Sequence, residues 1–443
     1  MIYFIFIFIL YCYYINMSFY SDSNVATRYI DPRVYVEAAD GGGRVTYELD
    51  AQEAAYLPNM RLTNIGVIIG AESPYNKQLG ALSVIRNIRL MDGKVILSQV
   101  NEFRFHRGFI NINKPNSVCE AVTSTLECNS LGFTVNGQTR KVARMADVNN
   151  ANIGDITAAA GDSPTSGSWL DLREVFPMLN SVSHLPTEVF KNLRLEIELD
   201  ATRLNQIATT TVQSLKTIRP ILCVDVLENP AIVDKMNASL QGASWLEVEH
   251  DQFLIPTHPS GNGTAQSQGV IQNVNVKLNG FNNKHLERLL MVKAIAPALE
   301  NNAGAVRGLG MYSSQACFRQ NIQYRVNGRN VLPALETSGN NRRLAMIVDN
   351  FGDCFSYIGS NQYGANNSAE LDDARDLLGQ LDYMGCYIGE YINDLQIIYS
   401  RTGLEDTTPK KPTTEQLTVH CYGETRKVLQ LQPNGQYRIA YTQ

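Results

Sequence analysis

Apolar and polar residues alternate along most of this 443-residue chain. A period of two places successive side chains on opposite faces of an extended strand, so the pattern predicts strands with one buried and one solvated face. Gly, Asn, Asp and Pro bound these runs, as they bound the strands of antiparallel sandwiches. The runs are 43–50, 81–91, 100–110, 193–199, 221–227, 245–255, 269–280, 320–328, 395–400, 417–422 and 436–441. We therefore predict an all-β protein.

One short hairpin pattern occurs twice, once in each half of the chain. Residues 87–97 read NIRLMDGKVIL, and residues 321–332 read NIQYRVNGRNVL. Asp-Gly or Asn-Gly between alternating runs is a strong hairpin signal, because both central residues of a type I′ turn need positive φ. We predict that Gly93 and Gly328 occupy equivalent places in two similar units.

The order of the later strands is repeated as well. In each half, a strand that begins with Asn-Leu or Asn-Asp-Leu is followed by a loop and a final strand. The matching segments are 192–200 and 218–228 in the first half, and 393–401 and 415–424 in the second. Two units, residues 17–228 and 229–443, are the economical interpretation of this repeat.

Helical spacing is scarce. Residues 171–180 could form a short helix broken at Pro177, and segments 284–292 and 369–381 carry apolar residues at helical intervals. Each is short enough to lie in a loop of a β protein. Long polar connections, which in compact proteins are usually functional or disordered, occupy 111–165, 256–268 and 337–385.

The first sixteen residues, MIYFIFIFILYCYYIN, differ from the rest of the chain. The run is shorter than the roughly 20 apolar residues of a membrane span. It also lacks the basic start and small-residue cleavage site of a signal peptide. Two interpretations remain open. Synthesis could start at Met17, with 1–16 representing AT-rich untranslated sequence, or 1–16 could be a short membrane-seeking segment.

Composition narrows the choice of partners. Hydrophobic residues make up 44% of the chain, which is ample for globular cores, and charged residues only 18%. The surface must therefore rely on Asn, Gln, Ser and Thr, which suits packing against neighbours as well as a loop-rich β protein. The net charge of −5 and the absence of a basic run argue against direct binding to nucleic acid.

The cysteines show neither a disulfide framework nor a zinc-site spacing, because no CxxC pair occurs. We expect free thiols, several of them in strands, as in an intracellular protein. The eight residues are Cys12, Cys119, Cys128, Cys223, Cys317, Cys354, Cys386 and Cys421.

One polar cluster suggests a metal site. In WLEVEHDQF, Glu247, Glu249 and Asp251 alternate, so they share one face of a strand and could converge on a hard cation. His250 points to the other face, which disfavours a mixed zinc site. We favour an amphipathic strand with its three carboxylates in solvent. Trp245 would fall on that acidic face and would need a loop or a neighbouring chain to cover it.

The other chemical candidates are weaker. An acidic group at 370–376 lacks the spacing and the glycine of an EF-hand, so we interpret it as a solvated helix face. The glycine-rich stretches 41–44 and 308–314 lack the Lys-Ser/Thr of a phosphate loop. His106 and His184 lie in no nucleophile motif, and we expect both to be structural. We predict no catalytic, cofactor-binding or metal-binding residues, and no enzyme activity.

Several of these stretches resemble one family in their order and spacing. They are SVIRNIRLMDGKVILSQVNEF (83–103), LDLREVFPMLNSVSHLPTEVFKNLRLEIEL (170–199), YINDLQIIYSR (391–401) and LTVHCYGETRKVLQLQPNGQYRIAY (417–441). They resemble a first-barrel hairpin, a helical excursion with a late strand, and the end of a second barrel. The family is that of the double jelly-roll major capsid proteins of adenovirus-like and polinton-like DNA viruses.

The resemblance implies two consecutive eight-stranded jelly rolls, with short helices in loops. It also implies a homotrimer with a pseudo-sixfold outline that tiles an icosahedral shell, with the long connections outward or at trimer seams. The implied partners are further copies of the chain, neighbouring capsomers, and penton and minor capsid proteins, without a cofactor. The implied location is the virion, assembled in the cytoplasm or nucleus of the host cell.

Two alternatives stay open. A lectin-like or cupin-like jelly roll is a binding module or enzyme, although a cupin needs clustered histidines. Only six histidines occur here, and no two lie within seven residues of each other. A vertex or minor capsid protein of the same lineage usually carries one jelly roll, so the duplicated order favours the subunit that tiles the facets.

Overall fold

The computed structural model describes residues 25–36, 42–65, 67–69, 82, 85–113, 132–135, 138–141, 152–153, 168–200, 215–217, 220–255, 271–295, 319–331, 335–336, 383–402, 417–432 and 435–441. The N-terminal run 1–16, the expected helix 369–381, connection 256–268 and most of connections 111–165 and 337–385 lie outside these residues. Among the described helices, none is long and apolar enough to cross a membrane.

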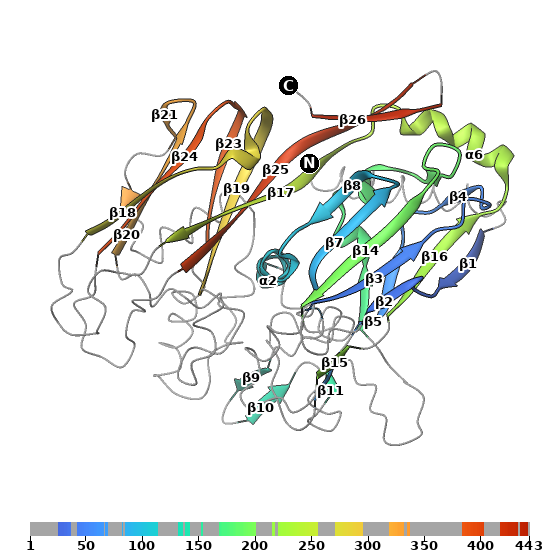
Figure 1. Cartoon of the computed structure of the whole chain (residues 1–443), viewed down its shortest axis with the longest axis horizontal. Coiled ribbons are helices and arrows are strands. Elements are labelled where there is room, and N and C mark those ends of the chain that lie inside the picture. Colours follow the sequence, from blue (N-terminus) through green and yellow to red (C-terminus); the bar gives the residue numbers. More distant parts are fainter. Residues whose placement is uncertain are drawn as a thin grey trace.

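The first half of the chain forms two antiparallel sheets (Figure 1). One has the order β1-β16-β5-β12, with the two-residue strand β4 beside β16 and β13 beside β4, and the other has the order β2-β3-β14-β7-β8. The strands of the first sheet are β1 (Val25–Ile30), β16 (Ile221–Leu227), β5 (Arg61–Ile65), β12 (Ser168–Asp171), β4 (Ala55–Tyr56) and β13 (Leu185–Pro186). Those of the second are β2 (Val34–Val36), β3 (Gly42–Glu48), β14 (Leu193–Asp200), β7 (Ile85–Asp92) and β8 (Val95–Val100).

Two small sheets are formed by segments of the connections between the main strands of this half. They contain β6 (Val67–Ile69), β11 (Asn152–Ile153) and β15 (Leu215–Thr217), and β9 (Gly132–Val135) with β10 (Gln138–Lys141).

The second half repeats the two-sheet plan. One sheet has the order β17-β25-β19-β23 with β26 beside β25, and the other has the order β18-β24-β20-β21 with β22 beside β20. The first contains β17 (Ser244–Ile255), β25 (Leu417–Leu431), β19 (Lys284–Ile295), β23 (Tyr383–Ile392) and β26 (Tyr437–Tyr441). The second contains β18 (Ile271–Lys277), β24 (Leu395–Thr402), β20 (Arg319–Val326), β21 (Arg329–Asn330) and β22 (Leu335–Glu336).

The strand orders of the two halves correspond one to one. Strands β1-β16-β5-β12 match β17-β25-β19-β23, and β3-β14-β7-β8 match β18-β24-β20-β21. Two packed four-stranded antiparallel sheets with this winding make a jelly roll. We call the two units the first and second jelly rolls, and the predicted fold class is confirmed.

The correspondence extends to the register of individual residues. In the first unit β14 lies between β3 and β7, and in the second unit β24 lies between β18 and β20. A row of three paired residues across the first set of strands therefore has a counterpart across the second. The matching rows are Tyr47–Leu195–Leu90 in the first jelly roll and Val276–Ile397–Tyr324 in the second.

The two hairpins noticed in the sequence occupy the same place in this strand order, as predicted. Their glycines differ by one position within the turn. Asp92 pairs with Val95, so Gly93 is the first of two turn residues, whereas Gly328 is the second, after Asn327. The φ angle is +57° at Gly93, +51° at Asn327 and +82° at Gly328. The second turn thus has positive φ at both central residues, as a type I′ turn does, and the first only at Gly93.

The predicted helix at 284–292 is wrong, because this segment is part of strand β19. Leu289 and Met291 face the core of the second jelly roll, while Leu290 and Val292 join a cluster shared with the first. A strand buried on both faces shows no alternation. A register shift between Leu286 and Arg288 disturbs the period further. The pattern therefore imitated a helix.

The predicted strand at 100–110 is also wrong. After Val100 the chain forms helix α2 (Phe103–Asn113), which lies between the two jelly rolls (Figure 1). Phe103, Arg104, Phe105 and Arg107 are all buried, so the helix has no wide polar face to reveal it in the sequence. Tertiary surroundings override the local pattern here.

The segment 171–180 contains two short helical pieces, the 3₁₀ turn η4 (Leu172–Glu174) and helix α5 (Pro177–Ser181). Pro177 opens α5 and does not break a helix, because proline's missing N–H is harmless in the first turn. A further helix, α6 (Pro230–Met236), is followed by the 3₁₀ turn η5 (Asn237–Leu240) and joins the two jelly rolls. Its N-cap is Asn229, whose side chain accepts a hydrogen bond from the Ala231 N–H.

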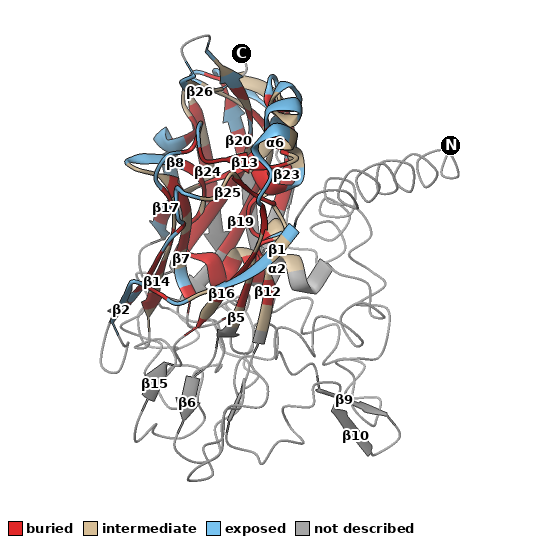
Figure 2. Cartoon of the chain, turned by 90° about the vertical axis from the view of Figure 1, so that its right-hand side faces the viewer, coloured by how far each residue is buried: buried red, intermediate tan, exposed pale blue. Residues whose placement is uncertain are grey.

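The buried side chains show that the two jelly rolls are packed together. Figure 2, coloured by burial, shows buried strands in both units. One apolar cluster lies wholly within the second unit. The larger cluster contains the core of the first unit together with Trp245, Val248, Leu290, Val292, Tyr422 and Leu429 of the second. The contact between the units is therefore a continuation of a core.

Candidate functional site

The surface where the two jelly rolls meet, which we call the seam, is the most elaborate polar and aromatic site among the described residues. Strand β17 contacts β8 and α5 of the first unit. Helix α2 lies against β25, and β26 reaches over the β7–β8 turn. The seam fixes the position of one jelly roll relative to the other. A structural role of the chain would therefore depend on the seam.

Glu247 joins the two units at the centre of the seam. Its side chain is buried, and Oε1 accepts hydrogen bonds from Ser98 Oγ and from the Gln99 backbone N–H, each at 2.9 Å. Oε2 accepts one from Trp245 Nε1 at 2.8 Å. Burial raises the pKa of Glu247, while Lys427 and the three donors act to lower it.

The expectation of three solvated carboxylates on β17 is therefore wrong for Glu247 and Glu249, which are both buried. The first jelly roll supplies the cover that Trp245 was expected to need, and Trp245 is only 4% exposed. The three acidic side chains bind different partners. Asp251 accepts from the Gly280 and Gln252 backbone N–H groups. They do not converge on one point, so they do not form the cation site considered from the sequence.

Glu249 anchors the last strand of the chain. Its carboxylate lies 3.2 Å from Lys427 Nζ and 3.4 Å from Lys284 Nζ, and it accepts a hydrogen bond from Tyr441 Oη at 2.7 Å. Both ammonium groups also lie over the Tyr441 ring. Although burial by itself raises the pKa of Glu249, the two lysines outweigh it and the pKa is lowered.

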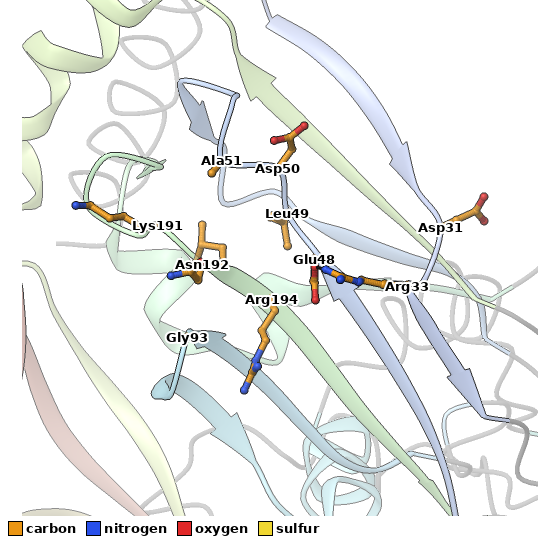
Figure 3. A pocket seen from close by; sticks show the side chains of 11 residues that line it. Asp31, Arg33, Glu48, Leu49, Asp50, Ala51, Gly93, Lys191, Asn192 and Arg194 are labelled. Carbon is orange, nitrogen blue, oxygen red and sulfur yellow. Dashed lines mark ion pairs between the residues drawn. The ribbon is translucent and has the colours of Figure 1, made fainter.

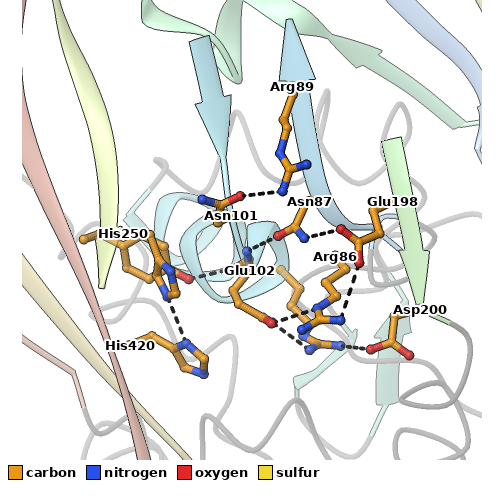
Figure 4. Close-up of polar contacts among 11 residues, drawn as sticks. Arg86, Asn87, Arg89, Asn101, Glu102, Glu198, Asp200, His250 and His420 are labelled. Atoms are coloured by element: carbon orange, nitrogen blue, oxygen red, sulfur yellow. Dashed lines mark hydrogen bonds and ion pairs between the residues drawn. The ribbon is translucent and has the colours of Figure 1, made fainter. Parts of the chain in front are cut away.

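Glu102 is the junction between β8, α2 and the second jelly roll (Figure 4). Its backbone has a φ of +46°, an uncommon conformation for a residue with a side chain. The backbone N–H donates to Asn87 Oδ1, and the carbonyl accepts from Tyr422 Oη at 2.8 Å. The side chain pairs with Arg86 at 3.0 Å and with Arg104 at 2.8 Å. These contacts hold the strained residue in place.

Helix α2 carries two buried arginines whose charges are compensated within the first unit. Arg104 pairs with Glu102 and approaches Asp200 at 3.8 Å, and Arg107 pairs with Glu174 at 2.6 Å. A buried charge that loses its partner is costly. The helix therefore depends on these acidic side chains to remain at the seam.

Aromatic and histidine rings fill the space between α2 and the second unit. Phe105 stacks on His420 at 4.3 Å, and His106 lies 5.2 Å from the Tyr422 ring. His250 Nε2 lies 3.1 Å from His420 Nδ1, so one ring donates and the other accepts (Figure 4). Burial lowers the pKa of His106 to about 4, with help from Arg107 and His250. Burial also lowers the pKa of His250, although the negative charges of Glu102 and Asp251 act to raise it.

The upper end of the seam involves the Gly93 hairpin itself. Tyr437 Oη of β26 donates a hydrogen bond to Asp92 Oδ2 at 2.9 Å, and the Tyr437 ring lies 4.7 Å from Phe190. His184 is buried near the linker, where Nε2 and Asn237 Oδ1 are 3.0 Å apart. Burial lowers the pKa of His184, partly offset by Asn237. The linker is thus tied to the first unit.

An open hollow of about 720 Å³ lies beside the same hairpin (Figure 3). Asp31, Glu48 and Asp50 bring negative charge, and Arg33, Lys191 and Arg194 bring an equal number of positive charges; Arg33 pairs with Glu48. Because the charges balance, the hollow favours neither an anionic nor a cationic ligand.

The remaining candidates from the sequence divide as follows. Cys223, Cys386 and Cys421 are free, buried and in strands, as predicted. The acidic group 370–376 and the stretch 308–314 lie outside the described residues. Among the described residues, no three His, Cys, Asp or Glu side chains are grouped to hold a metal ion.

Sequence reasoning did not find Glu102, Tyr422 or His420. The segment NEFRFHRGFI contained one usable signal, because Phe103, Arg107 and Ile110 recur at helical spacing after Asn101. The alternation of Phe103 and Phe105 concealed it. Nothing in the sequence pairs Glu102 with Tyr422, since they are 320 residues apart.

Comparison with known proteins identifies the class of fold. No protein-family profile matches the sequence, and no curated protein matches it. Among solved structures, the chain is similar to VP54 of PBCV-1, in a structure fitted into a cryo-EM reconstruction of the virophage Sputnik. The TM-score is 0.52 at 12% identity, over 95% of this chain and 98% of that one.

A second solved structure gives the same result. The quasi-atomic description of the PBCV-1 virus capsid matches with a TM-score of 0.52 at 11% identity, over 95% of this chain and 98% of that one. The neighbours are double jelly-roll capsid proteins, and this chain has their fold over nearly its whole length.

Proposed function

We propose that this chain is a major capsid protein, and that three copies form a capsomer of six jelly rolls that tiles an icosahedral virus shell. The observation that carries the proposal is the pair of jelly rolls with matching strand order, joined by a continuous buried seam. A rigid double unit repeated three times supplies a near-sixfold outline from one polypeptide. The similarity to the PBCV-1 capsid supports this proposal.

The role is structural, without a catalytic centre or cofactor. Buried titratable groups such as His106 and Glu247 contact side chains of the opposite jelly roll. We assign residues 17–228 to the first jelly roll and 229–443 to the second. The run of strands from β1 to β16 and from β17 to β26, with α6 between them, supports this division.

The partners follow from the same role. Each capsomer contacts further copies of itself in the shell, and penton and minor capsid proteins complete the vertices and the inner surface. The protein belongs to the virion and assembles in the host cell. The net charge of −5 supports packing against protein and not against nucleic acid.

Size-exclusion chromatography with light scattering tests the proposal. The purified chain should elute as a stable species of three times 49.3 kDa. Negative-stain electron microscopy of that species should show near-hexagonal particles. A stable monomer at micromolar concentration would contradict the capsid role and favour a jelly-roll binding module, and a pentamer would favour a vertex protein.

A further inference from the structure

Two histidine rings of the second jelly roll lie in contact with each other at the seam. His250 on β17 and His420 on β25 belong to neighbouring strands, and His250 Nε2 is 3.1 Å from His420 Nδ1. A neutral imidazole has one donor and one acceptor nitrogen, so two neutral rings satisfy this contact. One added proton places a positive charge in the seam, and a proton added to both rings sets two N–H groups against each other.

Helix α2 of the first jelly roll covers this histidine pair. Phe105 stacks on His420 at 4.3 Å, and the Arg104 guanidinium lies 5.1 Å from the same Phe105 ring. His250 lies 5.0 Å from the Tyr422 ring, whose hydroxyl binds the residue before the helix. His420 is 3% exposed, whereas His250 is partly exposed and gives solvent protons access to the pair.

The charges around the pair leave little to neutralise a new cation. The titratable and charged groups that face it, among the described residues, are Glu102, Arg104, His106, Arg107, Asp251 and Tyr422. The Glu102 carboxylate already pairs with Arg86 and Arg104. Asp251 already accepts two backbone N–H groups. A charged histidine pair would therefore lie against a helix that carries two arginines.

The direction of the pH effect follows from proton linkage. Burial lowers the pKa of His250 from its ordinary value of 6.5, and the negative charges of Glu102 and Asp251 offset this only in part. The closed seam thus binds fewer protons than an opened one as the pH falls through 6.5, and acid favours opening. A group that stays neutral in the closed form shifts the equilibrium toward opening about tenfold at one pH unit below its ordinary pKa.

We propose that His250 and His420 form an acid-operated catch, which holds α2 against the second jelly roll at neutral pH and releases it below about pH 6 while both jelly rolls stay folded. The catch acts within one chain, so it goes beyond the capsid role and does not require the trimer. In a shell it would give each subunit a tighter seam at neutral pH than in acid, a consequence that rests on the proposed function.

Hydrogen exchange of the α2 amides measures the release. The helix has 11 residues, and a helix of this length is marginal without tertiary packing. Mass spectrometry of the full chain at pH 7.5 and 5.5, corrected for the intrinsic exchange rate at each pH, should show peptides over 103–113 losing about tenfold in protection at pH 5.5. Peptides over 193–200 and 395–402, in the strands β14 and β24, should keep theirs.

His106 titrates beside the pair, so the substitutions are made in a His106→Gln chain, which should keep the acid loss. In that chain, His250→Phe with His420→Phe replaces both partners by apolar rings of similar shape. This double Phe variant should protect α2 equally at the two pH values. The matched control is His285→Phe on β19, where the ring lies 3.8 Å from Glu287 of its own unit. The control should lose α2 protection in acid as its parent does.

A second variant imitates the acid form at neutral pH. His250→Lys places a permanent positive charge beside α2. Its α2 peptides should exchange at pH 7.5 as fast as those of the wild type do at pH 5.5. Circular dichroism of each variant shows whether the two jelly rolls remain folded.

The outcomes decide the catch separately from the capsid role. An acid loss of α2 protection that disappears in the double Phe variant supports the catch. No loss in the wild type, a loss that persists in the double Phe variant, or a loss that extends to β14 and β24 overturns it. If the double Phe variant does not fold, wild-type protection of α2 in His250→Lys at pH 7.5 overturns it. Light scattering of the same samples reports the trimer, so a monomer with a working catch contradicts the capsid role alone.

Discussion

Single residues at the seam carry more than one task each. Glu102 binds Asn87 and Tyr422 through its backbone and Arg86 and Arg104 through its side chain, and it does so at a φ of +46°. Glu247 accepts hydrogen bonds from both units. A buried polar group that loses its partner is costly, whereas a fully satisfied one orients its neighbours. We therefore expect the seam to be sensitive to small changes.

Removing one hydroxyl tests the link between Tyr422 and Glu102. Tyr422→Phe leaves the buried Glu102 carbonyl without its 2.8 Å donor, and should lower the free energy of unfolding by about 1–3 kcal/mol. Urea denaturation followed by fluorescence measures it. Tyr387→Phe removes a hydroxyl from an exposed ring and should change stability by less than about 0.5 kcal/mol. Equal effects of the two substitutions would contradict this role.

Glu247 offers a graded test. Glu247→Leu leaves Trp245 Nε1, Ser98 Oγ and the Gln99 N–H without an acceptor, and should cost about 3 kcal/mol or more. Glu247→Gln keeps one oxygen and should cost less. The solvent-exposed control Glu228→Gln should cost under about 1 kcal/mol. If Glu247→Leu were as stable as the wild type, the polar contact would not hold the units together.

At the scale of elements, the two equivalent hairpins make different contacts in the two units. The β7–β8 hairpin is used within the chain, where Asp92 binds Tyr437. Within the part of the chain that the structure describes, the β20–β21 hairpin is held to its own unit, where Asn327 donates to the Tyr391 carbonyl and accepts from the Asn393 N–H. Asp92 of the first hairpin is thus part of the seam, although Lys94–Ile96 are exposed, and the tip of the second hairpin, Asn327–Asn330, is exposed as well.

The one-residue offset between the two turns predicts different responses to alanine. Gly328→Ala places a side chain at a φ of +82° and should destabilise the protein by about 1 kcal/mol. Lys94, at the corresponding turn position, does not have positive φ, so Lys94→Ala should be nearly neutral. Thermal unfolding of the two variants measures the difference. Similar losses in both would mean that the two turns share one conformation.

At the scale of the whole molecule, the seam contains two histidines, His106 and His250, whose pKa values are lowered by burial. His106 lies against Tyr422, and His250 lies against His420 and Tyr422. The charged groups acting on them are Arg107 for His106 and Glu102 and Asp251 for His250. The two units therefore meet through rings whose charging in place is unfavourable.

Stability should fall in mild acid for this reason. The pKa of His106 is lowered from 6.5 to about 4, so the unfolded chain binds more protons between these values. The contribution of His106 is complete above pH 6.5 and is lost as the pH falls toward 4. Unfolding free energies at pH 7.5 and 5.5 should differ by about 1 kcal/mol more in the wild type than in His106→Gln. Glu247, with its raised pKa, acts in the opposite direction in both proteins and cancels in this comparison. A loss of the same size in the variant would refute the assignment to His106.

Much of the architecture could be predicted from the local pattern of apolar and polar residues. Strands buried on one face alternate, as β14 does with Leu193, Leu195 and Ile197 inward, so their positions and their repetition in two units could be predicted. The hairpins could be predicted because positive φ restricts which residues form a tight turn. These features depend on near neighbours in the chain, and near neighbours are what a sequence displays.

Only the tertiary structure decided which segments are covered by the other jelly roll. Strand β19 and helix α2 lost their local signatures because both are buried between the units. Glu247 reads as a solvated carboxylate on its own strand and becomes a buried one because β8 lies beside it. Contacts between residues hundreds of positions apart leave no periodic trace in the chain. The sequence by itself therefore determined two repeated units of antiparallel strands, and long-range packing determined the seam that joins them.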